Sequence, residues 1–112
     1  MTTSEFVREL YDSTSTSPEG ITVDQAAEDI RNFRSDSWDI PEDITPEEYA
    51  AEWNHCCAVD LADRINRYGW REELCEKLCD LAGLLAEYRE ATGGEWNDLV
   101  YQAAEKLGVT LD

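Results

Sequence analysis

A run of carboxylates in the first half of the chain has the clearest chemistry in this sequence. Between Arg34 and Arg64 the chain holds nine Asp and Glu residues and no Lys or Arg, and from Asp36 to Glu52 the acids recur singly or in pairs every three to five residues. Carboxylates repeated in this way on a rigid support attract cationic groups and repel anions. The hypothesis places seven of them in one partner-binding surface: Asp36, Asp39, Glu42, Asp43, Glu47, Glu48 and Glu52.

The spacing of these acids is comparable with the spacing of phosphates in nucleic acid. On a helix or a fixed connector, neighbouring acids of the run lie about 7 Å apart or closer. Phosphates along one DNA strand are separated by similar distances, so the array can occupy a basic groove built for nucleic acid. The alternative is an acidic face that only keeps the protein soluble, as in a high-salt cytoplasm.

Other sequence features give little support for catalysis. The chain has one histidine, His55, and its neighbour Cys56 would point about 100° away from it on a helix, too far round for the two to act as a base and a nucleophile. The sequence contains no Gly-rich phosphate-binding loop and no nucleophile elbow. We therefore expect a non-enzymatic protein that carries no cofactor.

The cysteines and the acids also fit a metal site poorly. In a helical hairpin, Cys57, Cys75 and Cys79 would be spread over about 11 Å along the helix axes, too far for one tetrahedral zinc ion. The twelve-residue window from Asp36 to Glu47 begins and ends like a calcium loop, but Pro41 stands where that loop requires Gly. We expect no metal, and we expect the cysteines to be buried thiols.

Composition limits the class of protein further. The chain has 112 residues, of which 42% are hydrophobic, enough for one helical domain over residues 1–112 with its own core. Its net charge of −17 disfavours direct binding to nucleic acid or to anionic membranes. The first residues lack the pattern of a signal peptide, and no apolar run is long enough to span a membrane. We expect a cytoplasmic protein.

The acidic run must be positioned by helices, because no stretch alternates long enough to predict a strand. Capping boxes start two helices at Thr2 and Thr22, and a loop of hydroxyl residues, Pro and Gly separates them over residues 13–20. A connector from Ser35 to Ile44 follows, held to the core by Trp38, Ile40 and Ile44. The sequence predicts an all-α bundle of about five helices, near residues 3–12, 23–34, 46–68, 71–91 and 95–107.

The third helix has the strongest start signals. Thr45 is the expected N-cap, Pro46 takes the first helical position, and Glu48 completes a capping box. Its apolar stripe leaves Glu52 on the outward face, and a pair between Asp60 and Arg64 is expected at the stripe's edge. The helix ends before Gly69, and a short connection makes residues 46–68 and 71–91 a central antiparallel hairpin.

In size and charge the chain resembles the small acidic proteins that phages and conjugative elements encode against host nucleases, such as anti-restriction and anti-CRISPR inhibitors. The resemblance is one of composition and covers no motif. It implies a nucleic-acid-mimicking inhibitor that docks on the basic surface of a nucleic-acid-binding protein or nuclease complex.

Two other modes of interaction remain open from the sequence. Trp38, Trp70 and Trp96 stand at helix boundaries, where they are either exposed anchors for a partner protein or, as we favour, caps on the core. The leucine seam of residues 74–88 could also join two copies of the chain as a homodimer. Salt separates the alternatives, because apolar docking is nearly indifferent to ionic strength.

Overall fold

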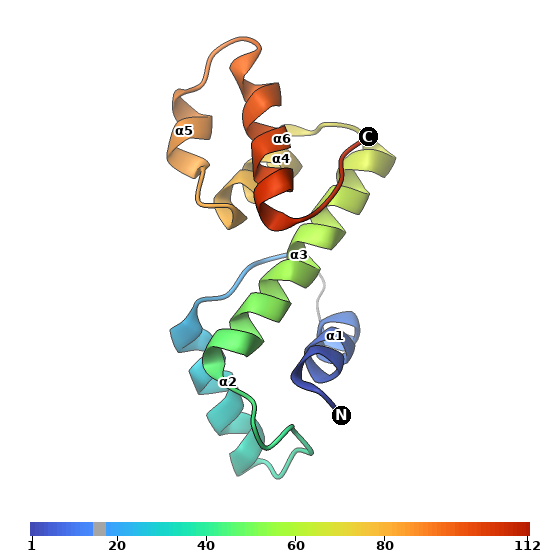
Figure 1. The fold of residues 1–112 in the computed structure, drawn as a ribbon, viewed down its shortest axis with the longest axis vertical. Helices are drawn as coiled ribbons and strands as arrows, with labels where there is room; N and C mark the ends of the chain where they lie inside the picture. The colour runs from blue at the N-terminus through green and yellow to red at the C-terminus, as the bar shows by residue number, and fades with distance from the viewer. Residues whose placement is uncertain (15–17) are drawn as a thin grey trace. The chain divides into compact units, whose positions relative to one another are not determined.

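The computed structural model describes residues 1–14 and 18–112, and within these ranges the protein is all-α with no strand (Figure 1). The all-α prediction is therefore confirmed. The six helices are α1 (Thr3–Thr14), α2 (Val23–Ser35), α3 (Pro46–Tyr68), α4 (Glu72–Leu81), α5 (Leu85–Glu90) and α6 (Glu95–Leu107).

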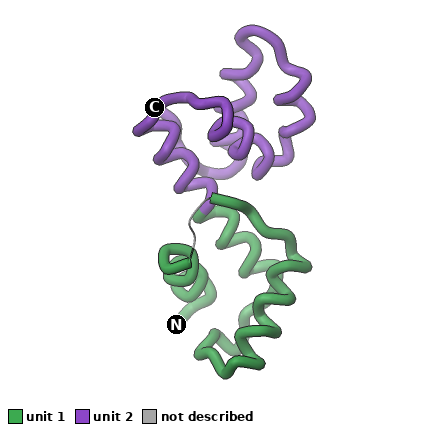
Figure 2. The backbone as a smooth tube through the Cα atoms, turned by 180° about the vertical axis from the view of Figure 1, so that it is seen from behind, with its two compact units in different colours: residues 1–56 green, residues 57–112 purple. Residues whose placement is uncertain are grey.

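The contacts of the chain group into two compact units, residues 1–56 and residues 57–112 (Figure 2). The first unit contains α1, α2 and the first half of α3. The second contains the second half of α3 together with α4, α5 and α6. Helix α3 contributes to both units, and one domain over residues 1–112 stays a prediction.

The helix starts of the first unit follow the capping signals of the sequence. The backbone N–H of Glu5 donates to the hydroxyl of Thr2 at 3.2 Å, and Thr22 and Gln25 form a complete capping box. The N–H of Glu48 donates to the hydroxyl of Thr45 at 3.2 Å, as expected for the start of α3. These bonds satisfy backbone donors that a helix start otherwise leaves without partners.

The core of the first unit joins α1, α2 and the start of α3. It is lined by Phe6, Val7, Leu10, Ala26, Ile30, Ile44, Tyr49 and Ala50. Asn54 of α3 adds a polar link, because its side-chain amide donates to the Ile21 carbonyl at 3.0 Å and accepts from the Ile21 N–H at 2.8 Å. One side chain thereby attaches the segment before α2 to α3.

The loop predicted over residues 13–20 begins later than expected. Ser13 and Thr14 belong to α1, where their hydroxyls donate to the carbonyls of Glu9 and Leu10, each at 2.7 Å. Each hydroxyl bonds to a carbonyl one turn earlier, which is a common arrangement of Ser and Thr inside a helix. Residues 15–17 of the predicted loop lie outside the described residues.

The second unit has its own apolar core, to which all four of its helices contribute. The core contains Leu61, Ala62, Ile65, Cys75, Leu78, Cys79, Ala82, Tyr88, Val100, Ala103, Ala104 and Leu111. Asn66 of α3 holds the end of the chain, because its amide donates to the Thr110 carbonyl at 3.1 Å and accepts from the Asp112 N–H at 2.9 Å. Gly69, with φ of 93°, ends α3 where the sequence predicts.

The prediction of one continuous helix over residues 71–91 is wrong. Gly83 takes a φ of 76° and closes α4 in a Schellman motif. Its N–H donates to the backbone carbonyl of Asp80 at 3.0 Å, and the Leu84 N–H donates to the backbone carbonyl of Cys79 at 2.8 Å. The Leu residues keep a helical spacing across this glycine and so concealed the break. The second arm of the predicted hairpin is therefore two helices, α4 and α5.

Candidate functional site

The first half of the acidic surface lies on the connector that leaves α2. The helix ends in a Schellman motif. The N–H of Ser37 donates to the Arg34 carbonyl at 3.2 Å, and the N–H of Trp38 donates to the Phe33 carbonyl at 2.9 Å. Ser37 has a φ of 60°, a left-handed conformation that costs a residue with a Cβ about 1 kcal/mol. The centroids of the Trp38 and Phe33 rings lie 4.8 Å apart, and this contact fixes the start of the connector.

The end of the connector is attached to the core by apolar side chains. Pro41 and Ile44 are buried, and Ile40 packs against the first-unit core while partly exposed. The Ile44 N–H also donates to the Pro41 carbonyl at 3.4 Å. The expected anchoring by Ile40 and Ile44 is confirmed, and it fixes the backbone that carries the neighbouring acids.

Six of the seven predicted site residues are exposed to solvent. None of the six forms an ion pair among the residues that the structure describes. Their charges are therefore not neutralised by neighbouring side chains. The six are Asp36, Asp39, Glu42, Asp43, Glu47 and Glu48.

Glu52 differs from the other six, and its predicted outward orientation is wrong. Its side chain is only 18% exposed and pairs with Arg8, with Nε and Oε1 2.9 Å apart. The helical wheel of α3 takes no account of α1, which supplies Arg8 to this position. Glu52 therefore links two helices of the first unit, and its charge is largely matched.

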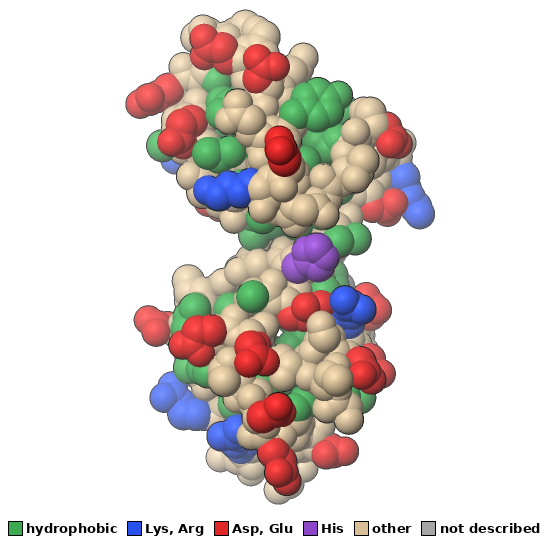
Figure 3. Space-filling model, in the orientation of Figure 1, with side chains coloured by type: hydrophobic (Ala, Val, Ile, Leu, Met, Phe, Trp, Pro, Cys, Tyr) green, Lys and Arg blue, Asp and Glu red, His purple; other side chains and the backbone are tan. Residues whose placement is uncertain are grey.

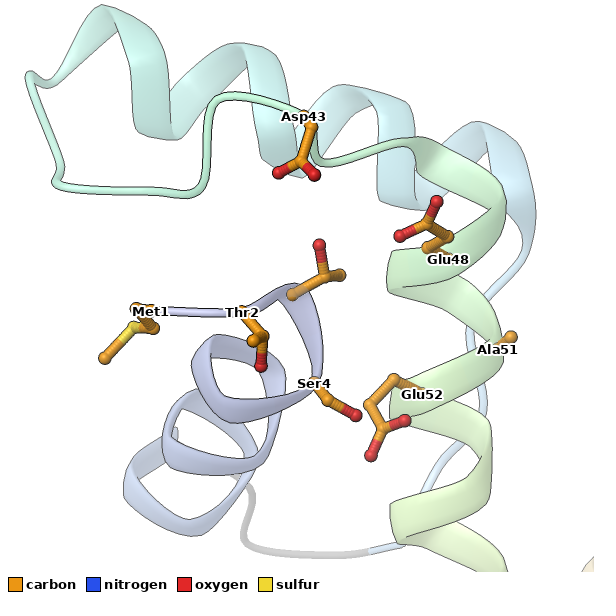
Figure 4. A pocket seen from close by; sticks show the side chains of 8 residues that line it. Met1, Thr2, Ser4, Asp43, Glu48, Ala51 and Glu52 are labelled. Carbon is orange, nitrogen blue, oxygen red and sulfur yellow. The ribbon is translucent and has the colours of Figure 1, made fainter.

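The structure brings three of the predicted acids to the edge of one pocket (Figure 4). The carboxylates of Asp43, Glu48 and Glu52 lie on one side, and the start of α1, residues 1–4, lies on the other. The cavity between them has a volume of about 570 Å³. An opening of this kind, with two unpaired carboxylates at its edge, can admit a basic side chain. We call it the carboxylate pocket.

Sequence reasoning missed the contribution of α1 to this pocket. Residues 1–4 lie about forty positions before Asp43, and no periodic pattern in one segment reports on its contact with another. Asp36, Asp39 and Glu42 of the predicted set lie outside the pocket lining, as does Glu47 in the first turn of α3.

Two aromatic side chains hold the first half of α3 in place by polar contacts. The hydroxyl of Tyr49 donates to the carboxylate of Asp29 at 3.3 Å, and the indole N–H of Trp53 donates to the carbonyl of Glu19 at 2.9 Å. Burial, followed by the charge of Asp29 and the hydrogen bond to it, raises the pKa of Tyr49 well above its usual value. The phenol therefore stays neutral and keeps its proton for this bond at physiological pH.

The cysteines lie mainly in apolar surroundings. Cys57, Cys75 and Cys79 are buried, as predicted, whereas Cys56 is half-buried, and all four are free thiols. Burial raises the pKa of the Cys56 and Cys75 thiols and brings that of Cys79 to about 11, so the reactive thiolate is disfavoured. Across the described ranges, no group of three or more His, Cys, Asp and Glu side chains is arranged to hold a metal ion.

The three tryptophans at helix boundaries are more exposed than the favoured core-capping prediction implies. Trp38 is 50% exposed, Trp70 36% and Trp96 47%. Each nevertheless has one face or edge against the protein, which explains why both roles fitted the sequence. By contrast, the leucine seam is used inside the second unit, where Leu78 is fully buried and Leu74 and Leu81 pack against the core.

None of the helices that the structure describes is both long and apolar enough to cross a membrane. Comparison of the chain with known protein families, with curated proteins and with solved structures gave no significant match.

Proposed function

We propose that the protein is a non-enzymatic inhibitor that mimics nucleic acid and docks its carboxylates on the basic groove of a DNA- or RNA-processing host defence protein. The inhibitor is of the anti-restriction or anti-CRISPR type. The observation that carries this proposal is the set of six exposed, unpaired carboxylates on one connector and the first turn of α3.

The energetic argument rests on counterion release. A basic groove that binds nucleic acid holds its Lys and Arg side chains ready for phosphates, and binding gains free energy from the release of condensed ions. Fixed carboxylates offer such a groove the same charge. Because the connector is attached to the core at both ends, little conformational entropy is lost when it docks.

The carboxylate pocket adds a point of specific contact. Asp43 and Glu48 stand at its edge without a cation of their own, whereas Glu52 is matched by Arg8. An Arg or Lys side chain from the partner would find two acceptors there and an opening large enough for its stem. The acidic surface would supply the electrostatic attraction, and the pocket would fix where one basic side chain of the partner binds.

Two double variants test the proposal. Glu47→Lys with Glu48→Lys reverses two charges in the acidic surface, and Glu87→Lys with Glu90→Lys makes the same change on α5 of the second unit. We expect host proteins captured from lysate by the wild type to be released by duplex DNA and by salt. We expect capture to be lost with the first variant and kept with the second, while circular dichroism shows both folded.

The proposal fails if DNA does not compete with the protein for its partner. It also fails if both double variants bind as well as the wild type. If the protein instead folds only at molar salt, the acidic surface serves adaptation to a high-salt cytoplasm.

A second candidate function is supported by the exposed tryptophans. Trp38, Trp70 and Trp96 supply large apolar surfaces of the kind that anchor protein–protein interfaces. An adaptor that docks through these residues would keep its partner at high salt. Replacing each Trp by Ala would then weaken binding more than the double reversal at Glu47 and Glu48.

A further inference from the structure

A second hollow lies within residues 57–112 and has aromatic walls. It has a volume of about 450 Å³ and is bounded by residues from α4, α5 and α6 and from the connection after α3. We call it the aromatic pocket. The residues that matter for its chemistry are Trp70, Glu72, Cys75, Glu76, Tyr88 and Trp96.

The two indoles of the aromatic pocket are held in place although both are partly exposed. The indole N–H of Trp96 donates to the Tyr88 carbonyl at 3.2 Å. The ring of Trp70 meets that of Tyr101 edge to face, with centroids 5.0 Å apart. Fixed aromatic faces that remain accessible favour a ligand that can use them, because the cost of ordering the rings has already been met.

The floor and the edge of the aromatic pocket have different characters. Cys75 and Val100 are buried and give an apolar floor. Glu72 and Glu76 bring carboxylates to the edge; Glu76 is 3.6 Å from the guanidinium of Arg89, whereas Glu72 has no ion pair among the residues described. The pocket therefore combines aromatic faces, an apolar base, the ion pair of Arg89 with Glu76, and the carboxylate of Glu72, which forms no ion pair among the described residues.

We propose that the aromatic pocket binds an arginine side chain of a partner polypeptide. A guanidinium stacks on an indole face by cation–π attraction, and its fork of N–H donors matches a carboxylate such as that of Glu72. The aliphatic stem of the arginine would lie on the floor of Cys75 and Val100. Arg89 already places a guanidinium beside Glu76, which shows that this edge accommodates such a group.

The electrostatic surroundings of Tyr88 agree with a cationic ligand. Its pKa is raised chiefly by burial and then by nearby acidic groups, which include Cys75, Glu72 and Glu76. At neutral pH the Cys75 thiol is uncharged, so the carboxylates of Glu72 and Glu76 are the groups that disfavour an anionic ligand. A neutral apolar side chain would leave the carboxylate of Glu72 without a partner. An arginine can stack on the indole faces and also donate hydrogen bonds to this carboxylate.

This site does not depend on the proposed function, because it lies in the other unit and shares no residue with the acidic surface. Loss of the Glu47 and Glu48 charges would abolish nucleic-acid mimicry and leave arginine binding intact. Loss of the aromatic pocket would have the reverse effect.

The test is a titration of the full chain, labelled with ¹⁵N, with the methylamide of N-acetyl-arginine. We expect saturable shifts of the Trp70 and Trp96 indole signals at millimolar concentrations and no matching shift of the Trp53 indole. The citrulline analogue has the same shape without the charge, and we expect it to give no saturable shift. Equal shifts with citrulline, or no saturation with arginine, would overturn the proposal.

Variants separate the site from general charge. We expect Trp96→Leu to weaken arginine binding about fivefold and Glu72→Gln about threefold. Glu105→Gln removes the same charge from the exposed face of α6 and should leave binding unchanged. A Glu105→Gln effect equal to that of Glu72→Gln would show attraction to net charge alone, and tighter saturation by tetramethylammonium than by arginine would reassign the pocket to quaternary ammonium ligands.

Discussion

The two units of the protein use the same structural devices but expose different chemistry. In each, an Asn of α3 binds the backbone of a distant segment with two hydrogen bonds: Asn54 binds Ile21 in the first unit, and Asn66 binds residues 110 and 112 in the second. Both units also close helices with Schellman motifs, α2 in the first unit and α4 and α6 in the second. The two units therefore differ in the charge of their surfaces more than in how they are built.

That difference lies in how the acids are matched. Residues 1–56 hold 14 acids and three bases, a net charge of −11, whereas residues 57–112 hold 12 acids and six bases, a net charge of −6. The second unit pairs Asp63 with Arg67 at 3.2 Å and Glu76 with Arg89 at 3.6 Å. Acids outnumber bases on the face of each unit drawn in Figure 3.

The two units differ in where their exposed, unpaired acids stand along the chain. Among the described residues the first unit leaves six such acids along one segment, residues 36–48. The second unit leaves more of them, spread over α4, α5, α6 and the end of the chain, and four line one hollow: Glu87, Glu90, Glu95 and Asp98. Like charges held close together repel one another and lower stability. A basic partner would relieve this repulsion in either unit.

The largest expected effect concerns the two asparagines. We expect Asn54→Ala to lower the free energy of unfolding by about 2 kcal/mol and Asn66→Ala by about 1 kcal/mol. The bonds of Asn54 are partly buried, so its loss leaves the Ile21 N–H and C=O without partners, whereas water can replace the bonds of Asn66. Urea denaturation of both variants measures the difference, and a larger loss for Asn66→Ala would contradict the comparison.

An effect of intermediate size concerns alkaline pH. The folded-state pKa of Tyr49 is raised by burial and by Asp29, so its contribution to stability is fully present below about pH 10, the usual pKa of a tyrosine, and is lost as pH rises above it. We expect a loss of up to about 1.4 kcal/mol per pH unit from this phenol. Titration of the buried thiols adds to the slope in the wild type.

Comparison with Tyr49→Phe isolates the phenol of the first unit from those thiols. Stability measured at pH 9 and pH 11 should fall less in Tyr49→Phe than in the wild type. Tyr68→Phe, which alters an exposed phenol, should behave as the wild type does. Equal losses in Tyr49→Phe and the wild type would rule out a role for Tyr49 in the alkaline transition.

The smallest expected effect exchanges the residues at two equivalent turns. Ser37 and Gly83 occupy the same left-handed position in the Schellman motifs that close α2 and α4, with φ of 60° and 76°. We expect Ser37→Gly to raise the free energy of unfolding by about 0.5 kcal/mol and Gly83→Ser to lower it by about 1 kcal/mol. A Cβ at Gly83 would meet only the Lys106 Nζ at 3.9 Å, so backbone conformation is the main cause. Thermal unfolding would detect both changes, and a gain from Gly83→Ser would refute the equivalence.

Local signals in the sequence predicted most of the fold, whereas long-range contacts were missed. Thr22, Thr45 and Gly69 mark helix ends by bonds to residues a few positions away, so the predictions there are confirmed. Gly83 carried the right signal, but the leucine spacing across it favoured one long helix. A helix end can be predicted when one local signal marks it, and the prediction is ambiguous when two signals disagree.

The candidate site shows the same limit. The exposure of Asp36 and Glu47 follows from their local positions and was predicted. The pairing of Glu52 with Arg8 joins residues 44 positions apart, and neither residue has a neighbour in sequence that indicates it. The aromatic pocket was missed for the same reason, because Trp70 and Trp96 line it from positions 26 residues apart, on either side of α4 and α5.

The half-buried position of Cys56 makes this thiol a natural handle for chemical labelling. Its three companions are buried, and Cys56 is the last residue of the first unit, in the middle of α3. Its raised pKa calls for mildly alkaline conditions, because thiolate is the form that reacts with maleimides. A single dye or spin label on the unmodified sequence would then report from the helix that both units share, and it could follow a basic partner and an arginine ligand in one experiment.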